Sequence, residues 1–227
     1  MLGILKKIFS SKKPHSEWMV LEFLKGNLPN NPIIIEAGAH EGLDTRRMAS
    51  IWPNCILYAF EPVPSVFSLL KNNVKLLENV HVINLALSDT SIQSKMYVST
   101  GRSNGSSSLL KPKEHLNFHP DVFFNEEIIV QTITLHDFAK ENLLEKIDFM
   151  WFDLQGMEYK VLSESKLFLK NIGYIFCEVS LMETYEGVMK YPEFKSWMLE
   201  QGFQVIDEYL NWKDMGNVLF RNKNYIV

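Results

Sequence analysis

The stretch Ile33-Ile34-Ile35-Glu36-Ala37-Gly38-Ala39-His40-Glu41-Gly42 decides how this chain folds. Three β-branched apolar residues and an acid indicate a buried strand, small residues then form a tight turn, and a helix begins after Gly42. Glycine lacks a Cβ and tolerates positive φ, so we expect this turn to let a ligand approach the backbone closely. In open α/β sheets, ligands bind outside the carboxyl ends of the strands. The stretch therefore predicts a nucleotide-like cofactor at this strand end.

Segments typical of strands and of helices alternate along the rest of the chain. We expect strands at 33–36, 56–61, 80–85, 147–154, 174–179, 203–209 and 217–221, and helices at 43–51, 66–77, 157–169 and 194–201. This alternation predicts βαβ units around a mostly parallel sheet, and the continuous apolar strands predict helices on both faces. No strong helical pattern separates the last two strands, so we expect them to pair as an antiparallel hairpin.

Two segments depart from this rhythm. Residues 1–32 form an N-terminal helical extension to the main domain at 33–227, and residues 91–135 form an insertion. Within the insertion, 96–98 and 128–130 are typical of short strands around a polar middle. The Gly/Ser-rich loop at 101–108 is our candidate lid or substrate contact, because long polar loops in compact domains are usually functional or disordered. Residues 1–13 are either a plain cap helix or frayed end, or a weak contact with a membrane surface.

The composition is that of an ordinary cytoplasmic globular protein. The chain has 227 residues, 46% of them apolar and 22% charged, and its formal net charge is −4. This balance predicts no nucleic-acid partner, and no apolar run approaches the roughly 20 residues that span a bilayer. The two cysteines, Cys55 and Cys177, lie in apolar strand-like runs and are interpreted as reduced core thiols. The six histidines show no metal-ligand spacing, so we expect no metal site.

Acids after the first two strands narrow the choice of cofactor. Glu61 ends the second strand and is placed to accept hydrogen bonds from both ribose hydroxyls of a nucleoside. A dinucleotide turn reads G-x-G-x-x-G, whereas three residues separate Gly38 from Gly42 here, with Glu36 before the turn and Glu41 inside it. Acids there repel phosphate and favour a cationic ligand such as S-adenosylmethionine. Two alternatives are exposed strand-end acids and an NAD-dependent oxidoreductase, which the missing third glycine disfavours.

Further polar residues lie at the same predicted edge of the sheet. Asp153 follows a very apolar strand and is our candidate for holding the methionine ammonium or for receiving a proton from a substrate hydroxyl. The alternative for Asp153 is an N-cap of the next helix. Glu178 either faces the substrate or is a structural strand-end acid. Asp44 and Thr45 either cap the first helix and match its dipole in the first turn, or contact the methionine end of the cofactor.

These residues belong to a series of short motifs that resembles the FkbM-type S-adenosylmethionine-dependent methyltransferases over about residues 33–179. The matching pieces, in order, are Glu36-Ala37-Gly38-Ala39-His40-Glu41-Gly42, Tyr58-Ala59-Phe60-Glu61-Pro62, Asn84-Leu85-Ala86-Leu87-Ser88-Asp89, Gly105-Ser106-Ser107-Ser108-Leu109, Thr134-Leu135-His136-Asp137-Phe138 and Asp153-Leu154-Gln155-Gly156-Met157-Glu158. Each piece is short, but their order gives a combined signal. The resemblance implies a class I methyltransferase with a Rossmann-like α/β fold and a mostly parallel, seven-stranded sheet.

The resemblance also implies roles for individual residues. The implied cofactor contacts are Glu36, Gly38, Ala39, His40, Gly42, Asp44, Thr45, Glu61, Pro62, Ala86, Leu87, Ser88, Asp153 and Gln155. The small polar loop implies substrate contacts at Ser106, Ser107 and Ser108, and Asp153 and Glu178 are the candidate catalytic bases. Glu36 and His40 stand where the family more often has Asp and Asn. Gln155 stands where Glu is frequent, which argues against a metal held by a carboxylate cluster.

The predicted reaction is methyl transfer from S-adenosylmethionine to an oxygen nucleophile, on a hydroxyl of a sugar, a glycan or a secondary metabolite. The acceptor class rests on the resemblance alone. Two alternatives stay open. A methyltransferase acting on nitrogen or on a protein side chain is favoured by a deep cleft lined with aromatic residues. A non-catalytic S-adenosylmethionine-binding module is favoured by a blocked acceptor side. The sequence does not specify the oligomeric state.

Overall fold

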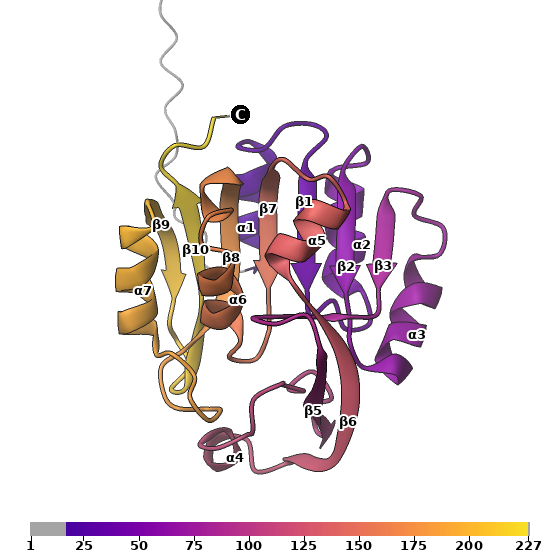
Figure 1. Cartoon of the computed structure of the whole chain (residues 1–227), viewed down its shortest axis with the longest axis vertical. Coiled ribbons are helices and arrows are strands. Elements are labelled where there is room, and N and C mark those ends of the chain that lie inside the picture. The colour runs from indigo at the N-terminus through magenta and orange to yellow at the C-terminus, as the bar shows by residue number, and fades with distance from the viewer. Residues whose placement is uncertain (1–16, 227) are drawn as a thin grey trace, which may run out of the picture.

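Seven strands form one central sheet in this computed structural model, which describes residues 17–226 (Figure 1). They are β1 (Ile33–Ala37), β2 (Ile56–Phe60), β3 (Val80–Ile83), β7 (Ile147–Phe152), β8 (Ile172–Ser180), β9 (Phe203–Tyr209) and β10 (Met215–Asn222). Their order is β3-β2-β1-β7-β8-β10-β9, in which β10 is antiparallel to both neighbours and the other pairs are parallel. The seven predicted strands and the antiparallel hairpin at the end are therefore confirmed.

The strand order reverses between β1 and β7. The chain lays down β1, β2 and β3 toward one edge and then returns to the other side of β1 with β7. The two strands pair in parallel, so that Ala37 lies beside Phe152 at their carboxyl ends. Open α/β sheets bind ligands in the crevice at such a reversal. The topology therefore places the ligand site where β1 and β7 end.

Helices cover both faces of the central sheet. One face carries α1 (Glu17–Lys25), α2 (Leu43–Ile51) and α3 (Pro64–Val74), and the other carries α5 (Leu135–Glu141), α6 (Glu158–Glu164) and α7 (Tyr191–Glu200). Phe149 and Trp151 of β7 pack into the first core, whereas Met150 and Phe152 pack into the second. Burial on both faces explains why every residue of this strand from Phe149 to Phe152 is apolar.

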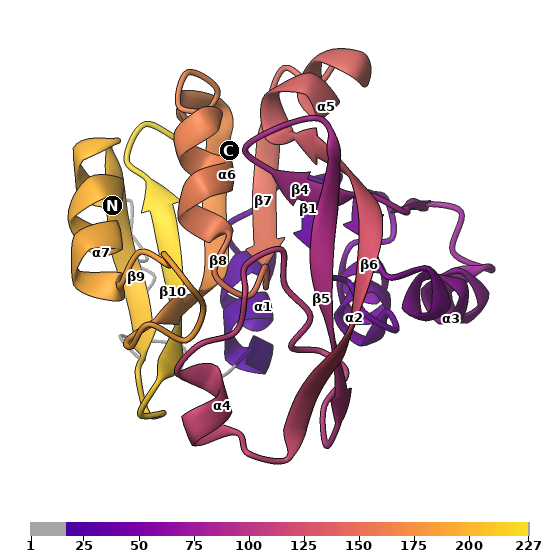
Figure 2. The same cartoon turned by 60° about the horizontal axis from the view of Figure 1, so that its bottom comes forward.

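The insertion builds a second sheet of three strands, in which β6 (Val122–Thr134) lies between β4 (Ala86–Ser88) and β5 (Gln93–Gly101). β5 and β6 pair antiparallel as a long arm, and the segment that joins them contains the short helix α4 (His115–Phe118) (Figure 2). The sequence predicts only three-residue strands at 96–98 and 128–130. Both strands are longer because polar residues on their exposed side interrupt the apolar pattern without interrupting the pairing.

Several boundaries differ from the predicted ones. The strand expected at 80–85 ends at Ile83, and Ala86 then starts β4 in the second sheet. The strand expected at 147–154 ends at Phe152, so Asp153 lies in the following turn. The helix expected at 157–169 ends at Glu164 and is followed by the 3-10 turn η1 (Leu169–Asn171).

Part of the expected N-terminal extension belongs to the core of the domain. Leu21 and Leu24 of α1 are fully buried against the central sheet. The expectations for residues 1–13 lie outside the described residues, and the boundary at residue 32 stays a prediction. Among residues 17–226, no helix combines the length and the apolar character that crossing a bilayer requires.

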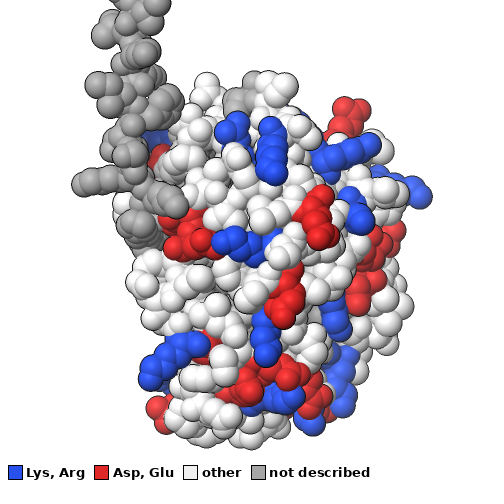
Figure 3. All heavy atoms as spheres, turned by 90° about the vertical axis from the view of Figure 1, so that its left-hand side faces the viewer, with Lys and Arg blue, Asp and Glu red and all other residues white. Residues whose placement is uncertain are grey.

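The remaining sequence expectations concern thiols and surface charge. Cys55 and Cys177 are buried free thiols, as predicted. On the face that α7 and β9 present, basic and acidic side chains are interspersed (Figure 3). One contact between these two elements joins Lys195 Nζ to Glu208 Oε1 at 2.6 Å.

Candidate functional site

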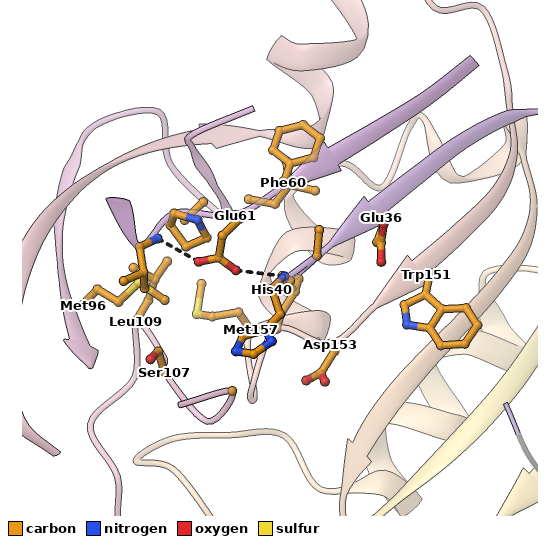
Figure 4. Close-up of a pocket in the computed structure, with 18 of the residues that line it drawn as sticks. Glu36, His40, Phe60, Glu61, Met96, Ser107, Leu109, Trp151, Asp153 and Met157 are labelled. Atoms are coloured by element: carbon orange, nitrogen blue, oxygen red, sulfur yellow. Dashed lines mark hydrogen bonds between the residues drawn. The ribbon is translucent and has the colours of Figure 1, made fainter. Parts of the chain in front are cut away.

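A cavity of about 370 Å³ lies at the carboxyl ends of β1, β2 and β7 (Figure 4). Of the residues predicted to contact a cofactor, those that line it are Glu36, Gly38, Ala39, His40, Asp44, Glu61, Pro62, Ala86, Leu87 and Asp153. Those that do not line it are Gly42, Thr45, Ser88 and Gln155. The volume lies within the range of small-molecule sites in proteins. The fold thus brings most of the predicted cofactor residues around one space.

The two glycines of the turn after β1 are required by contacts within the protein. Both have positive φ, +87° at Gly38 and +83° at Gly42. A Cβ on Gly38 would lie 2.1 Å from the carbonyl oxygen of Asp153, and a Cβ on Gly42 would lie 2.7 Å from Leu70 Cδ1. We expected these glycines to admit a ligand. Gly38 does line the cavity, but the closest approach at each glycine is made by the protein itself.

Gly38→Ala is expected to cost on the order of 3 kcal/mol or more of folding stability, because the added Cβ meets the backbone of Asp153 just after β7. Gly202→Ala is the matched control, since Gly202 has φ +90° and nothing within 4 Å of the added Cβ. It is expected to cost only about 1 kcal/mol, the penalty of the left-handed backbone. Urea denaturation of both variants checks the difference, and equal losses would show that the approach to Asp153 is not what fixes Gly38.

Glu61 is held at the middle of the cavity by two backbone amides. Its Oε2 accepts a hydrogen bond from His40 N at 3.0 Å, and its Oε1 accepts one from Val63 N at 2.8 Å. The side chain is only 6% exposed, and burial raises the pKa of Glu61 to about 7 although both amide bonds favour the ionised form. The alternative that Glu61 is an exposed strand-end acid is therefore wrong.

Glu36 is buried still more deeply and is hydrogen-bonded to the side chain of Thr45. Thr45 Oγ1 donates to Glu36 Oε2 at 2.5 Å. Glu36 is 2% exposed, so the exposed-acid alternative is wrong here as well, and burial raises its pKa to about 8. Thr45 lies behind Glu36 and not at the cavity wall. Neither Thr45 nor Asp44 caps α2, because Gly42 occupies the N-cap position and no side chain bonds there.

Asp153 and Glu178 share one neutral partner. The Gln155 side-chain nitrogen donates to Asp153 Oδ1 at 2.6 Å and to Glu178 Oε1 at 3.1 Å. Burial raises the pKa of both acids, and the charge of Asp153 raises that of Glu178 further. Asp153 lines the cavity, whereas Glu178 does not. Asp153 is therefore an acid at the cavity wall, and Glu178 is a second acid that the same Gln155 amide contacts.

The N-cap interpretation of Asp153 is wrong. The N-cap position of α6 is Met157. The backbone amides of Leu154 and Gly156 donate instead to the Glu158 carboxylate, at 2.8 and 3.1 Å. Glu158 was not recognised as a functional or capping residue in the sequence. The sequence signal for Glu158 is a glutamate in the first turn of a helix. Backbone amides at the start of a helix lack partners within it, and a carboxylate there can accept their hydrogen bonds.

The polar loop of the insertion closes one side of the cavity. Its lining residues are Ser103, Asn104, Gly105 and Ser107. His40 Nε2 lies 2.9 Å from Asn104 Oδ1 and so joins the loop to the turn after β1. Ser106 and Ser108, which we assigned to the substrate, do not line the cavity. Ser108 is buried, and its hydroxyl donates to the Gln155 carbonyl oxygen at 2.8 Å.

The cavity has one acidic end and one apolar end. In Figure 4, Glu36 and Asp153 lie toward one side, Met96 and Leu109 toward the other, and Glu61 between them. In the described part of the chain, no Lys or Arg is among the residues that line this space, and no group of three or more His, Cys, Asp or Glu side chains is arranged to hold a metal. The cavity therefore suits a ligand with a cationic end and an apolar, planar end.

Comparison with known proteins gives results for both family and fold. The family profile described as "Methyltransferase FkbM domain" matches residues 36–205. The chain is 30% identical over 223 residues to the 2-O-methyltransferase NoeI of Sinorhizobium fredii (strain NBRC 101917 / NGR234), covering 96% of this chain and 88% of that protein.

Two solved structures share the fold at low sequence identity. The METTL16 MTase domain aligns with a TM-score of 0.54 and 14% identity, over 89% of this chain and 64% of that one. Aeropyrum pernix fibrillarin, solved in complex with natively bound S-adenosyl-L-methionine, aligns with a TM-score of 0.50 and 15% identity, over 89% of this chain and 74% of that one. Both are matches of overall fold, which is the class predicted from the sequence.

Proposed function

This chain belongs to the FkbM methyltransferase family, and we propose that it methylates a hydroxyl group of a sugar, a glycan or another small secondary metabolite. The family makes the protein an S-adenosylmethionine-dependent methyltransferase. The observation that carries the proposal is the cavity with buried acids at one end and apolar residues at the other. The name of the relative NoeI, a 2-O-methyltransferase, supports oxygen as the acceptor atom.

The residues around the cavity fit S-adenosylmethionine. The buried carboxylates of Glu36 and Asp153 suit its cationic methionine end, and Glu61 has lone pairs left for the ribose hydroxyls after its two amide bonds. Met96 and Leu109 provide an apolar surface for the adenine ring. When bound, S-adenosylmethionine supplies a methyl group on an electrophilic sulfonium. Among the described residues, no Lys or Arg lines the cavity, which disfavours a cofactor that carries phosphate.

The protein's own part in the reaction is positioning and proton transfer. Asp153 stands at the cavity wall and accepts the proton of the acceptor hydroxyl at its carboxylate. Glu178 shares the Gln155 amide with it and provides a second carboxylate nearby. The loop with Asn104 covers the cavity and holds reacting groups at near-attack distance, the largest contribution expected for a displacement of this kind.

Two other functions remain as alternatives for the test below. Methyl transfer to nitrogen or to a protein side chain needs the same cofactor residues but no base for a hydroxyl. A non-catalytic binding module would retain the cofactor contacts and lack an open acceptor side. The carboxylate pair Asp153 and Glu178, held by Gln155, favours the hydroxyl acceptor over both alternatives.

The test is a screen of methyl transfer with S-adenosylmethionine labelled in its methyl group. The protein is incubated with mono- and oligosaccharides, phenolic and polyketide alcohols, amines and peptides, and label in each product is counted. We expect transfer to one hydroxyl-bearing class. Label in amines or peptides alone would contradict the oxygen acceptor. Cofactor binding with no transfer to any class would favour the binding module.

Binding of S-adenosylmethionine is expected to strengthen about tenfold or more between about pH 6 and pH 7.5. The pKa of Glu36 is raised to about 8 and that of Glu61 to about 7, both by burial. In the protein without ligand, burial favours the protonated forms of Glu36 and Glu61. Their contribution to folding stability is present below the ordinary pKa near 4.5 and is lost as the pH rises through the raised pKa values of about 7 and 8. The cation and the ribose hydroxyls require the ionised forms, so affinity rises as the protons leave.

Calorimetric titration across this pH range measures the effect. Glu36→Gln is expected to bind more weakly and to show a flatter pH dependence, because one of the buried carboxylates that titrate in this range is gone. Affinity that is constant with pH, or that falls as the pH rises, would show that these carboxylates do not face the cofactor.

A further inference from the structure

Tyr185 lies behind the cavity, in the loop between β8 and α7, and its hydroxyl reaches the Gln155 side chain. The oxygen is 2.7 Å from Gln155 Oε1 and 2.8 Å from the carbonyl oxygen of Ser106. Tyr185 is 1% exposed and Gln155 is 6% exposed, so neither bond competes with bulk water. Tyr185 does not line the cavity. It therefore reaches the reaction only through other residues.

The Gln155 amide has all of its polar atoms engaged. Its oxygen accepts from Tyr185, and its nitrogen donates to Asp153 and to Glu178. An amide that could turn over would present its oxygen to both carboxylates and repel them. The proton that the Tyr185 hydroxyl donates to Oε1 stabilises the orientation in which the amide nitrogen faces the two carboxylates, and the Ser106 carbonyl oxygen at 2.8 Å shares that single proton. The backbone beneath it is also strained, since Gln155 has φ +52°.

We propose that Tyr185 is a positioning residue, whose hydroxyl fixes the Gln155 amide so that its nitrogen faces Asp153 and Glu178 and holds both carboxylates in place for methyl transfer. This inference rests on the proposed function, because it places Asp153 beside the cofactor. The same hydroxyl also contacts the Ser106 carbonyl, so it links the loop over the cavity to the carboxylate pair. The sequence motifs indicated Asp153, Gln155, Glu178 and Ser106 but not Tyr185, which joins them.

The charged groups around Asp153 and Glu178 determine the direction in which loss of the Tyr185 hydroxyl shifts the pKa values of this pair. Donation from Gln155 favours the ionised forms of Asp153 and Glu178, against burial, which raises both pKa values. The other titratable groups around the pair and around Tyr185 are His40, Asp44, Glu61, His115, His119, Glu158, Cys177 and Asp214. Acids predominate among them, so they oppose ionisation of the pair further. Removing the hydroxyl is therefore expected to shift the titration of the pair to higher pH.

The experiment is calorimetric titration of S-adenosylmethionine into the full chain at several pH values, and it needs no acceptor. Tyr185→Phe keeps the ring against His115 and removes only the hydroxyl. We expect its curve of affinity against pH to move to higher pH. Its affinity would be about tenfold weaker than that of the wild type at the acidic end of the range, and the two curves would converge as the pH rises and the pair ionises. A merely structural role would weaken binding equally at every pH.

Tyr225→Phe is the matched control. The Tyr225 hydroxyl also donates a hydrogen bond to a side chain, at 2.8 Å to Asp148 Oδ1, but Asp148 lies near the start of β7, away from the cavity. Its curve should coincide with that of the wild type. Gln155→Met is the second variant, and it should reproduce the displacement if Tyr185→Phe does not fold. In the double variant the two displacements should not add, because both act through the same amide.

The outcomes separate the two proposals. A Tyr185→Phe curve that overlies the wild-type curve, or one weakened equally at all pH values, would overturn the positioning role while leaving the proposed function intact. A displaced Gln155→Met curve beside an undisplaced Tyr185→Phe curve would assign the effect to Gln155 alone and would also overturn it. A wild-type protein that does not bind S-adenosylmethionine at any pH would overturn the proposed function and this inference with it.

Discussion

Glu61→Ala is expected to weaken the binding of S-adenosylmethionine by about 100-fold or more. A hydrogen bond to a charged group contributes roughly 1.5–3 kcal/mol, and the Glu61 carboxylate is placed to accept one from each ribose hydroxyl. The carboxylate is also fixed in advance by His40 N and Val63 N, so little entropy is lost when the ligand binds. Calorimetry on the purified variant measures the change in affinity directly.

The variant has a second effect that the controls must separate. Removing the carboxylate leaves the amides of His40 and Val63 without their acceptor, which costs about 1–3 kcal/mol of stability for a buried group. Glu61→Gln keeps an acceptor for one of them and should retain more stability while still binding weakly. Glu41 is an exposed acid in the turn after β1 and does not line the cavity, so Glu41→Ala should bind S-adenosylmethionine normally. Unchanged affinity in folded Glu61→Ala would contradict the ribose assignment.

Asp153→Asn is expected to lower kcat for methyl transfer by about 100- to 10,000-fold, the usual contribution of a general base. Asparagine has nearly the same shape and keeps an oxygen for the Gln155 nitrogen, but it cannot accept the hydroxyl proton. Affinity for S-adenosylmethionine should fall by about tenfold or less, because Glu36 and Glu61 still contact the ligand. Steady-state rates with the acceptor from the labelled screen, together with calorimetry, give both quantities.

Glu178→Gln is the comparison that assigns the proton acceptor. Glu178 contacts the same amide but does not line the cavity, so we expect a smaller loss of kcat, about tenfold. A larger loss in Glu178→Gln than in Asp153→Asn would reverse the two roles. A large loss of cofactor affinity with unchanged kcat in Asp153→Asn would instead assign Asp153 to the methionine ammonium.

The strand pattern of the central sheet was predictable because burial on both faces leaves a local record. β7 is apolar except for Asp148, and its neighbours have similar runs, so all seven strands appear in the sequence. β5 and β6 were underestimated because their stability comes from mutual pairing and not from apolar character. Boundaries shifted where a strand leaves one sheet for another, as between Ile83 and Ala86, which no local pattern marks.

The site residues divide in the same way. Glu36, Glu61 and Asp153 could be identified because each ends a strand, and parallel strands end at a common edge. Their burial and raised pKa values could not be identified, because these depend on what the helices and the insertion place over them. Assigned roles for Ser106 and Ser108 at the substrate remain predictions, although neither lines the cavity.

By itself, the sequence determined the alternation of strands and helices, the acids at the strand ends and the absence of a dinucleotide turn. Each of these is a pattern of residues that are neighbours in the chain. Only the tertiary structure decided which groups hold those acids. His40 meets Asn104 across 64 positions, and Tyr185 meets Gln155 across 30. It also showed that the approach of the Asp153 carbonyl fixes Gly38, and that the Ile33 amide donates to Asp148 Oδ2, 115 positions away. The physical reason is that hydrogen-bond partners and steric neighbours are set by distance in space, and spacing along the chain records that distance only within one helix, strand or turn.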